Sequence, residues 1–97
     1  MIKNEVKKII EGANNFNEFI NGSIGYIDIN VYNLPIRIYR KNVGAEMYYM
    51  LPYNKDFNYR GVVIFMKYAI PILTEMIEKE RQKNLMGSDC VKVPNIQ

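Results

Sequence analysis

Arginine and tyrosine side chains alternate through the middle of this 97-residue chain, and together they could hold a nucleic-acid strand. Residues 35–68 carry six basic and two acidic side chains, while the segments on either side are nearly balanced. An arginine fork binds two phosphate oxygens, and a tyrosine ring stacks on a base. The candidate nucleic-acid-binding residues are Arg37, Tyr39, Arg40, Lys41, Tyr53, Lys55, Tyr59 and Arg60.

The same residue types also suit a protein partner, because tyrosine, methionine and arginine are enriched at the centres of protein interfaces. Two functions therefore stay open. One is a small regulator that binds DNA or RNA. The other is a protein-interaction module, such as an inhibitor or adaptor encoded by a phage or mobile element, acting through the same surface. Binding that weakens with salt favours the first, and a salt-tolerant stoichiometric protein partner favours the second.

Enzymatic chemistry has little support in the sequence. The chain has no histidine and one cysteine, which excludes histidine-based triads, histidine metal sites and multi-cysteine zinc sites. Glu75 and Glu78 share a helix face, but Lys79 and Arg81 neutralise it. We therefore expect a protein that is not an enzyme and that uses no cofactor and no metal.

The N-terminal segment, residues 1–21, is expected to be helical. Its apolar residues recur every three or four positions from Ile2 to Ile20, which places them on one stripe of a helix. Gly12 and the following asparagines predict a break near residues 12–15. Gly22 suits the left-handed residue that ends a helix.

The period then changes to two, which is typical of half-buried strands. Tight turns between the strands favour an antiparallel meander. The fourth strand is inferred from a continuous apolar run, Val62–Phe65. The expected strands are Ile24–Tyr32, Leu34–Tyr39, Glu46–Leu51 and Arg60–Met66.

A second helix is expected over Tyr68–Lys83, with Pro71 in its first turn and residues 85–97 as a flexible tail. The fold class is therefore α+β in a single domain, residues 1–97. An N-terminal helix precedes a four-stranded antiparallel meander sheet, and a C-terminal helix packs on that sheet.

Composition also sets expectations for location and assembly. No apolar run approaches the ~20 residues that cross a membrane, so no membrane association is expected. Cys90 is the single cysteine and cannot form an intramolecular disulfide, so a reducing cytoplasm is the simplest location for the protein. Free sheet edges predict a homodimer.

From about residue 23 to residue 83 the chain resembles the SpoVG (stage V sporulation protein G, septation regulator) family. The matching segments are Tyr26–Tyr32, Leu34–Arg40, Met47–Pro52, Tyr53–Asp56, Tyr59–Arg60, Ile64–Lys67 and Tyr68–Arg81. The resemblance implies a sheet-and-helix unit over residues 23–84 and a dimeric bacterial regulator that binds DNA and RNA. It also implies that Lys55 and Arg60 contact phosphates.

Overall fold

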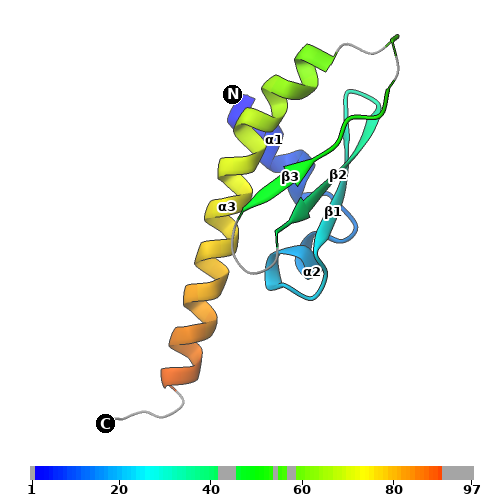
Figure 1. Ribbon diagram of the computed structural model, residues 1–97. Coiled ribbons are helices and arrows are strands. Elements are labelled where there is room, and N and C mark those ends of the chain that lie inside the picture. The colour runs from blue at the N-terminus through cyan, green and yellow to red at the C-terminus, as the bar shows by residue number, and fades with distance from the viewer. Residues whose placement is uncertain (1, 42–45, 54, 57–58, 91–97) are drawn as a thin grey trace.

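The protein is an α+β fold with helices at both ends of a three-stranded antiparallel sheet (Figure 1). The computed structural model describes residues 2–41, 46–53, 55–56 and 59–90. The strands follow one another in the order β1-β2-β3. The elements are α1 (Ile2–Glu11), α2 (Phe16–Asn21), β1 (Tyr26–Val31), β2 (Leu34–Arg40), β3 (Met47–Tyr49) and α3 (Tyr59–Cys90).

The N-terminal segment forms two helices with the expected break between them. α1 ends at Glu11 and α2 begins at Phe16, so the interruption falls on Gly12 and the two asparagines. Gly22 follows α2 with a φ of 88°, and its N–H donates to the Phe19 carbonyl. A side chain on Gly22 would be strained in this left-handed conformation, which confirms its predicted place at the helix end.

β1 and β2 form a tight hairpin whose register fixes the two faces of the sheet. Val31 pairs with Leu34, and the two turn residues Tyr32 and Asn33 both have positive φ, as a type I′ turn requires. Burial alternates along both strands, with the isoleucines inside. The two-residue period predicted from the sequence is therefore confirmed for this hairpin.

The predicted fourth strand over Arg60–Met66 is wrong, because these residues form the start of α3. Val62, Phe65, Met66 and Ala69 are buried, which is the three- and four-residue step of a helix. Val63 and Ile64, which lie between these positions in the chain, are 38% and 42% exposed, respectively. The apolar run therefore lies in an amphipathic helix, with Val62 and Phe65 on its buried side and Val63 and Ile64 on its exposed side, and it is not a strand covered on both faces.

The bounds of the C-terminal helix also differ from the prediction. It begins at Tyr59, so Pro71 lies in its interior. Proline has no N–H to donate to the Lys67 carbonyl. Pro71 lies on the exposed side of the helix, where a water molecule can donate to that carbonyl instead. Residues 85–90, expected in the tail, continue the helix, and residues 91–97 lie outside the described part of the chain.

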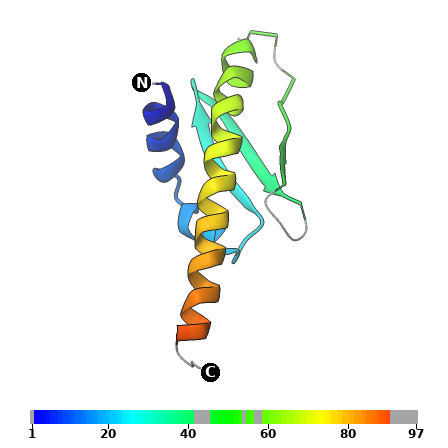
Figure 2. The ribbon, with the colours of Figure 1, turned by 90° about the vertical axis from the view of Figure 1, so that its left-hand side faces the viewer.

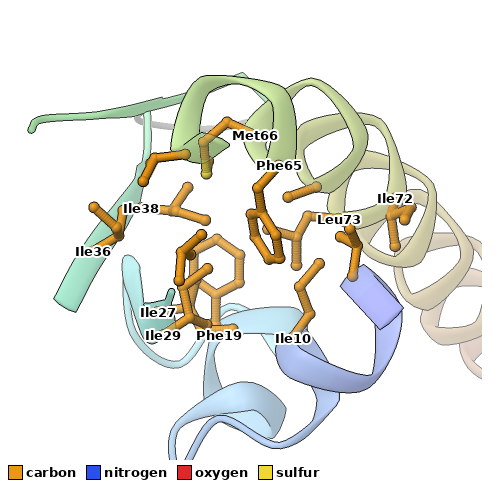
Figure 3. Packing of buried hydrophobic residues seen from close by; sticks show 14 of the residues in the cluster. Ile10, Phe19, Ile27, Ile29, Ile36, Ile38, Phe65, Met66, Ile72 and Leu73 are labelled. Carbon is orange, nitrogen blue, oxygen red and sulfur yellow. The ribbon is translucent and has the colours of Figure 1, made fainter. Parts of the chain in front are cut away.

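One apolar core joins the sheet to the helices. Figure 3 shows Ile27 and Ile38 of the sheet in one cluster with Phe65 and Leu73 of α3, and α1 and α2 contribute Ile10 and Phe19 to the same cluster. None of the buried side chains in the described ranges is polar or charged. Figure 2 shows α3 crossing the sheet and continuing beyond it, which gives the molecule its elongated extents of 60 × 29 × 20 Å.

Candidate nucleic-acid interface

The face of the sheet that points away from α3 carries a row of three tyrosines. Tyr26 of β1 pairs with Tyr39 of β2, and Tyr39 pairs with Tyr48 of β3. Directly opposed residues on neighbouring strands point to the same side of a sheet, so one tyrosine from each strand stands in a line. We call this set, Tyr26, Tyr39 and Tyr48, the tyrosine row.

The rings of the row are ordered by their own contacts. Tyr39 and Tyr48 stack with ring centroids 5.0 Å apart and planes 12° from parallel. Tyr48 is the more exposed member of this pair, at 43%, while Tyr26 and Tyr39 are half-buried. A stacked pair with an exposed member offers aromatic surface on which a further flat ring can be placed.

Arg37 lies beside the tyrosine row on the same face, because it is two positions from Tyr39 on β2. Its Nε and Nη2 donate to the two carboxylate oxygens of Asp28 at 2.7 and 3.1 Å. The guanidinium lies 4.1 Å from the centroid of the Tyr26 ring. Hydrogen bonding to Asp28 raises the pKa of Arg37 further, so this group is a permanent cation held over an aromatic ring.

Arg40 is separated from Arg37 by the sheet itself. It shares the inward phase of Ile36 and Ile38, and its Nη1 donates to the Phe19 carbonyl at 3.0 Å. Partial burial and, to a smaller extent, nearby Arg81 lower the pKa of this guanidinium. Arg40 therefore joins β2 to the end of α2, and the structure does not bring it to the tyrosine row.

The remaining predicted site residues lie outside the tyrosine row. Lys41 follows β2, and its backbone N–H donates to the Glu46 carbonyl at 2.8 Å. Tyr53 and Lys55 lie on the connection from β3 to α3, both exposed, with Tyr53 at 90%.

Two more of the predicted residues open α3. The Tyr59 hydroxyl donates to the Pro52 carbonyl, which fastens the connection to the start of the helix. Arg60 is exposed on the first turn of α3. The eight candidates therefore do not form one surface. We call the face of the sheet that points away from α3 the outer face, and only Arg37 and Tyr39 among the candidates lie on it with the tyrosine row.

The candidate set chosen from the sequence left out two members of the row and one of its neighbours. Tyr26 and Tyr48 complete the row, and Asp28 holds Arg37 in place. Tyr48 could have been selected from the sequence, because it is out of phase with the buried side of its strand. Its alignment with Tyr39 could not be predicted, because the register is known only once the strands are seen paired.

Asn15 has a structural task that the sequence did not indicate. Its side-chain amide donates to the Tyr26 carbonyl at 3.3 Å and accepts from the Asp28 N–H at 3.2 Å. These two backbone groups lie on the edge of β1. Asn15 thus takes the place of a fourth strand there and fixes the part of β1 from which Tyr26 and Asp28 project.

The chain matches no protein-family model, no curated protein and no solved structure in the comparisons made. The resemblance to the SpoVG family therefore stays a prediction. In the described part of the chain, no helix is long and apolar enough to span a membrane, and no group of three acidic or cysteine side chains is arranged to hold a metal ion.

Proposed function

We propose that this protein is a small non-enzymatic regulator that binds single-stranded nucleic acid, DNA or RNA, on the outer face of its sheet. The observation that carries the proposal is the tyrosine row with Arg37 beside it. Aromatic rings on an exposed sheet face stack on bases, and an adjacent arginine meets the backbone phosphates. Stacking of this kind contributes about 1–3 kcal/mol per base.

A single strand fits this surface better than a duplex does. Rings that lie across a sheet reach the flat faces of bases only when those bases are not stacked on one another. The described basic side chains that an intact duplex would need are also divided between elements. Arg37 is on the outer face, Arg40 is on the inner side, and Lys67 is on α3.

This division of the basic side chains between elements determines the salt dependence of binding that we expect. Arg37 lies beside the row, and Lys8 of α1 lines the same groove as Arg37, so these are the two cations that we expect to meet phosphates. Two phosphate contacts with a single strand give a log–log salt slope of about −1.4, shallower than the slope for a continuous basic surface.

The proposal is tested by fluorescence anisotropy with labelled single strands of mixed sequence, at two salt concentrations, and with the matching duplex. We expect Tyr48→Ala to weaken single-strand binding roughly tenfold, because it removes the exposed ring of the stacked pair. Tyr68→Ala is the matched control, since Tyr68 is 41% exposed but lies on α3. Equal losses in the two variants, or tighter binding of the duplex, would contradict the proposal.

A separate surface favours the second candidate, a protein-interaction module. Val63, Ile64 and Tyr68 are partly exposed along one side of α3. Apolar helix residues of this kind are typical anchors for a protein partner. If this candidate is right, Ile64→Lys should abolish capture of a stoichiometric partner, whereas Tyr48→Ala should leave it intact.

Self-association is a further part of the proposal. Asn15 covers part of the β1 edge, whereas β3 has no neighbouring strand on its outer side within the described residues. An open edge strand can pair with the same strand of a second copy. We therefore propose a homodimer joined through β3.

A further inference from the structure

Backbone hydrogen bonds show which groups of β3 face β2. The Lys41 N–H donates to the Glu46 carbonyl at 2.8 Å, so these two residues are opposed with their backbone groups facing each other. Hydrogen-bonded and non-hydrogen-bonded pairs alternate along antiparallel strands, so Tyr39 and Tyr48, two positions further along the register, are again a hydrogen-bonded pair. The backbone groups of Tyr48 are therefore used within the sheet.

The edge of β3 that points away from β2, which we call the free edge, carries four backbone groups. Met47 and Tyr49 flank Tyr48, so their N–H and C=O groups point away from β2. No strand among the described residues pairs with this edge. A second copy of β3 running in the opposite direction offers donors and acceptors that match these groups.

A hollow beside the free edge, between β3 and α3, is also uncovered. Its volume is about 640 Å³, and it is lined by Lys41, Glu46, Met47, Ile70 and Thr74. One lysine and one glutamate give this lining no excess charge, so it does not favour a strongly acidic or a strongly basic partner. A second copy of the chain suits it, because the half-buried side of β3 brings apolar surface to the same side of the sheet.

We propose that two copies pair through β3 with Tyr48 opposite Tyr48 of the second copy, so that their tyrosine rows join into one site for a single nucleic-acid strand. In this register Met47 lies opposite Tyr49 of the second copy, and every backbone group of the two free edges is hydrogen-bonded. A shift by two residues would leave either Met47 or Tyr49 without a partner in β3, which spans Met47–Tyr49. This inference rests on the proposed function, which supplies the row and the β3 pairing.

The joined site follows from this register. The two Tyr48 residues form a non-hydrogen-bonded pair, whose Cα atoms are about 4.5 Å apart. The row then continues through Tyr48, Tyr39 and Tyr26 of the second copy, on the same face of a shared sheet. With strands spaced ~4.8 Å apart, the joined row spans roughly 24 Å. On the side facing α3, Tyr49 of the second copy lies against Met47 and covers part of the hollow.

Disulfide trapping tests the register in the full chain. Tyr48→Cys, combined with Cys90→Ser so that one cysteine remains, should give a cross-linked dimer on mild oxidation, because Cα atoms about 4.5 Å apart can be bridged. Met50→Cys in the same background is the matched control, since Met50 is also exposed. Its counterpart would lie roughly 13 Å away, which is too far for a disulfide. Cross-linking of the control instead, or of neither variant, would overturn the register.

Stoichiometry tests whether the joined rows hold one strand. In sedimentation velocity of the wild-type chain with a mixed-sequence single strand of about ten nucleotides, we expect two chains per oligomer. The oligomer should also shift the equilibrium from monomer to dimer, because binding and pairing are coupled. One oligomer per chain would overturn this inference and leave the proposed function standing. If no oligomer binds at low salt, the proposed function fails, and the joined site fails with it.

Discussion

Arg37 and Arg40 stand three positions apart on β2 and have unrelated surroundings. Arg37 lies on the outer face against Tyr26 and Asp28, and Arg40 lies on the inner side at the end of α2. Strand alternation alone separates them, because odd and even positions of a strand face opposite sides. Arg40 could have been excluded from the outer face on the sequence, since it continues the phase of Ile36 and Ile38.

These two arginines give opposite expectations on substitution. Arg37→Ala should weaken nucleic-acid binding and leave the urea midpoint nearly unchanged, because exposed ion pairs stabilise little. Arg40→Ala should lower the free energy of unfolding by on the order of 1 kcal/mol, because the Phe19 carbonyl loses a charged donor. Urea denaturation and anisotropy on both variants check this. Reversed effects would place the interface on the inner side.

At the scale of elements, the short strands and helices were predictable and the boundary between strand and helix at residue 60 was not. Val62–Phe65 is apolar throughout, and a run of that length fits a buried strand or a buried helix segment equally. What decides is the longer pattern. The buried positions 62, 65, 66, 69, 72, 73 and 77 form one helical stripe, which the assumed boundary at Tyr68 had divided.

The helical assignment predicts different tolerance at adjacent positions of α3. Ile64→Lys should change the free energy of unfolding little, because Ile64 is on the exposed side. Phe65→Ala should cost about 3–5 kcal/mol, because Phe65 is 2% exposed and fills the core. Urea denaturation measures both. Comparable large losses at the two positions would instead favour the strand covered on both faces.

The edge of β1 offers a second test at this scale. Asn15→Asp keeps an acceptor for the Asp28 N–H but removes the donor to the Tyr26 carbonyl and adds a negative charge near Asp28. We expect a loss of about 1–2 kcal/mol in the free energy of unfolding. Asn14→Asp is the matched control and should change it little. Equal stability of the two variants would show that Asn15 does not hold this edge.

Over the whole molecule, the charge excess of residues 35–68 does not become one basic surface. The basic side chains of this stretch are distributed over β2, the β3–α3 connection and α3, on different sides of the fold. The net charge of a segment can be counted in a sequence, but the side of the fold on which each charged side chain lies depends on register and on the element that the residue joins. For the same reason Lys8 could not be predicted near the outer face, which it approaches because α1 lies beside β1.

The proposed dimer belongs to this scale. Sedimentation velocity over a range of micromolar concentrations should show a shift from monomer to dimer, because β3 pairing depends on concentration. A single monomeric species over the whole range would exclude association through β3. Nucleic-acid binding would then have to arise from one copy of the tyrosine row.

An amide chemical-shift titration of the isotope-labelled protein with a single-stranded oligomer would locate the nucleic-acid interface directly. We expect shift changes concentrated on the outer face, at Tyr26, Arg37, Tyr39 and Tyr48, with α3 residues such as Ile64 unaffected. Changes concentrated on α3, or no changes with excess oligomer at low salt, would contradict the claim that the outer face of the sheet is a nucleic-acid interface.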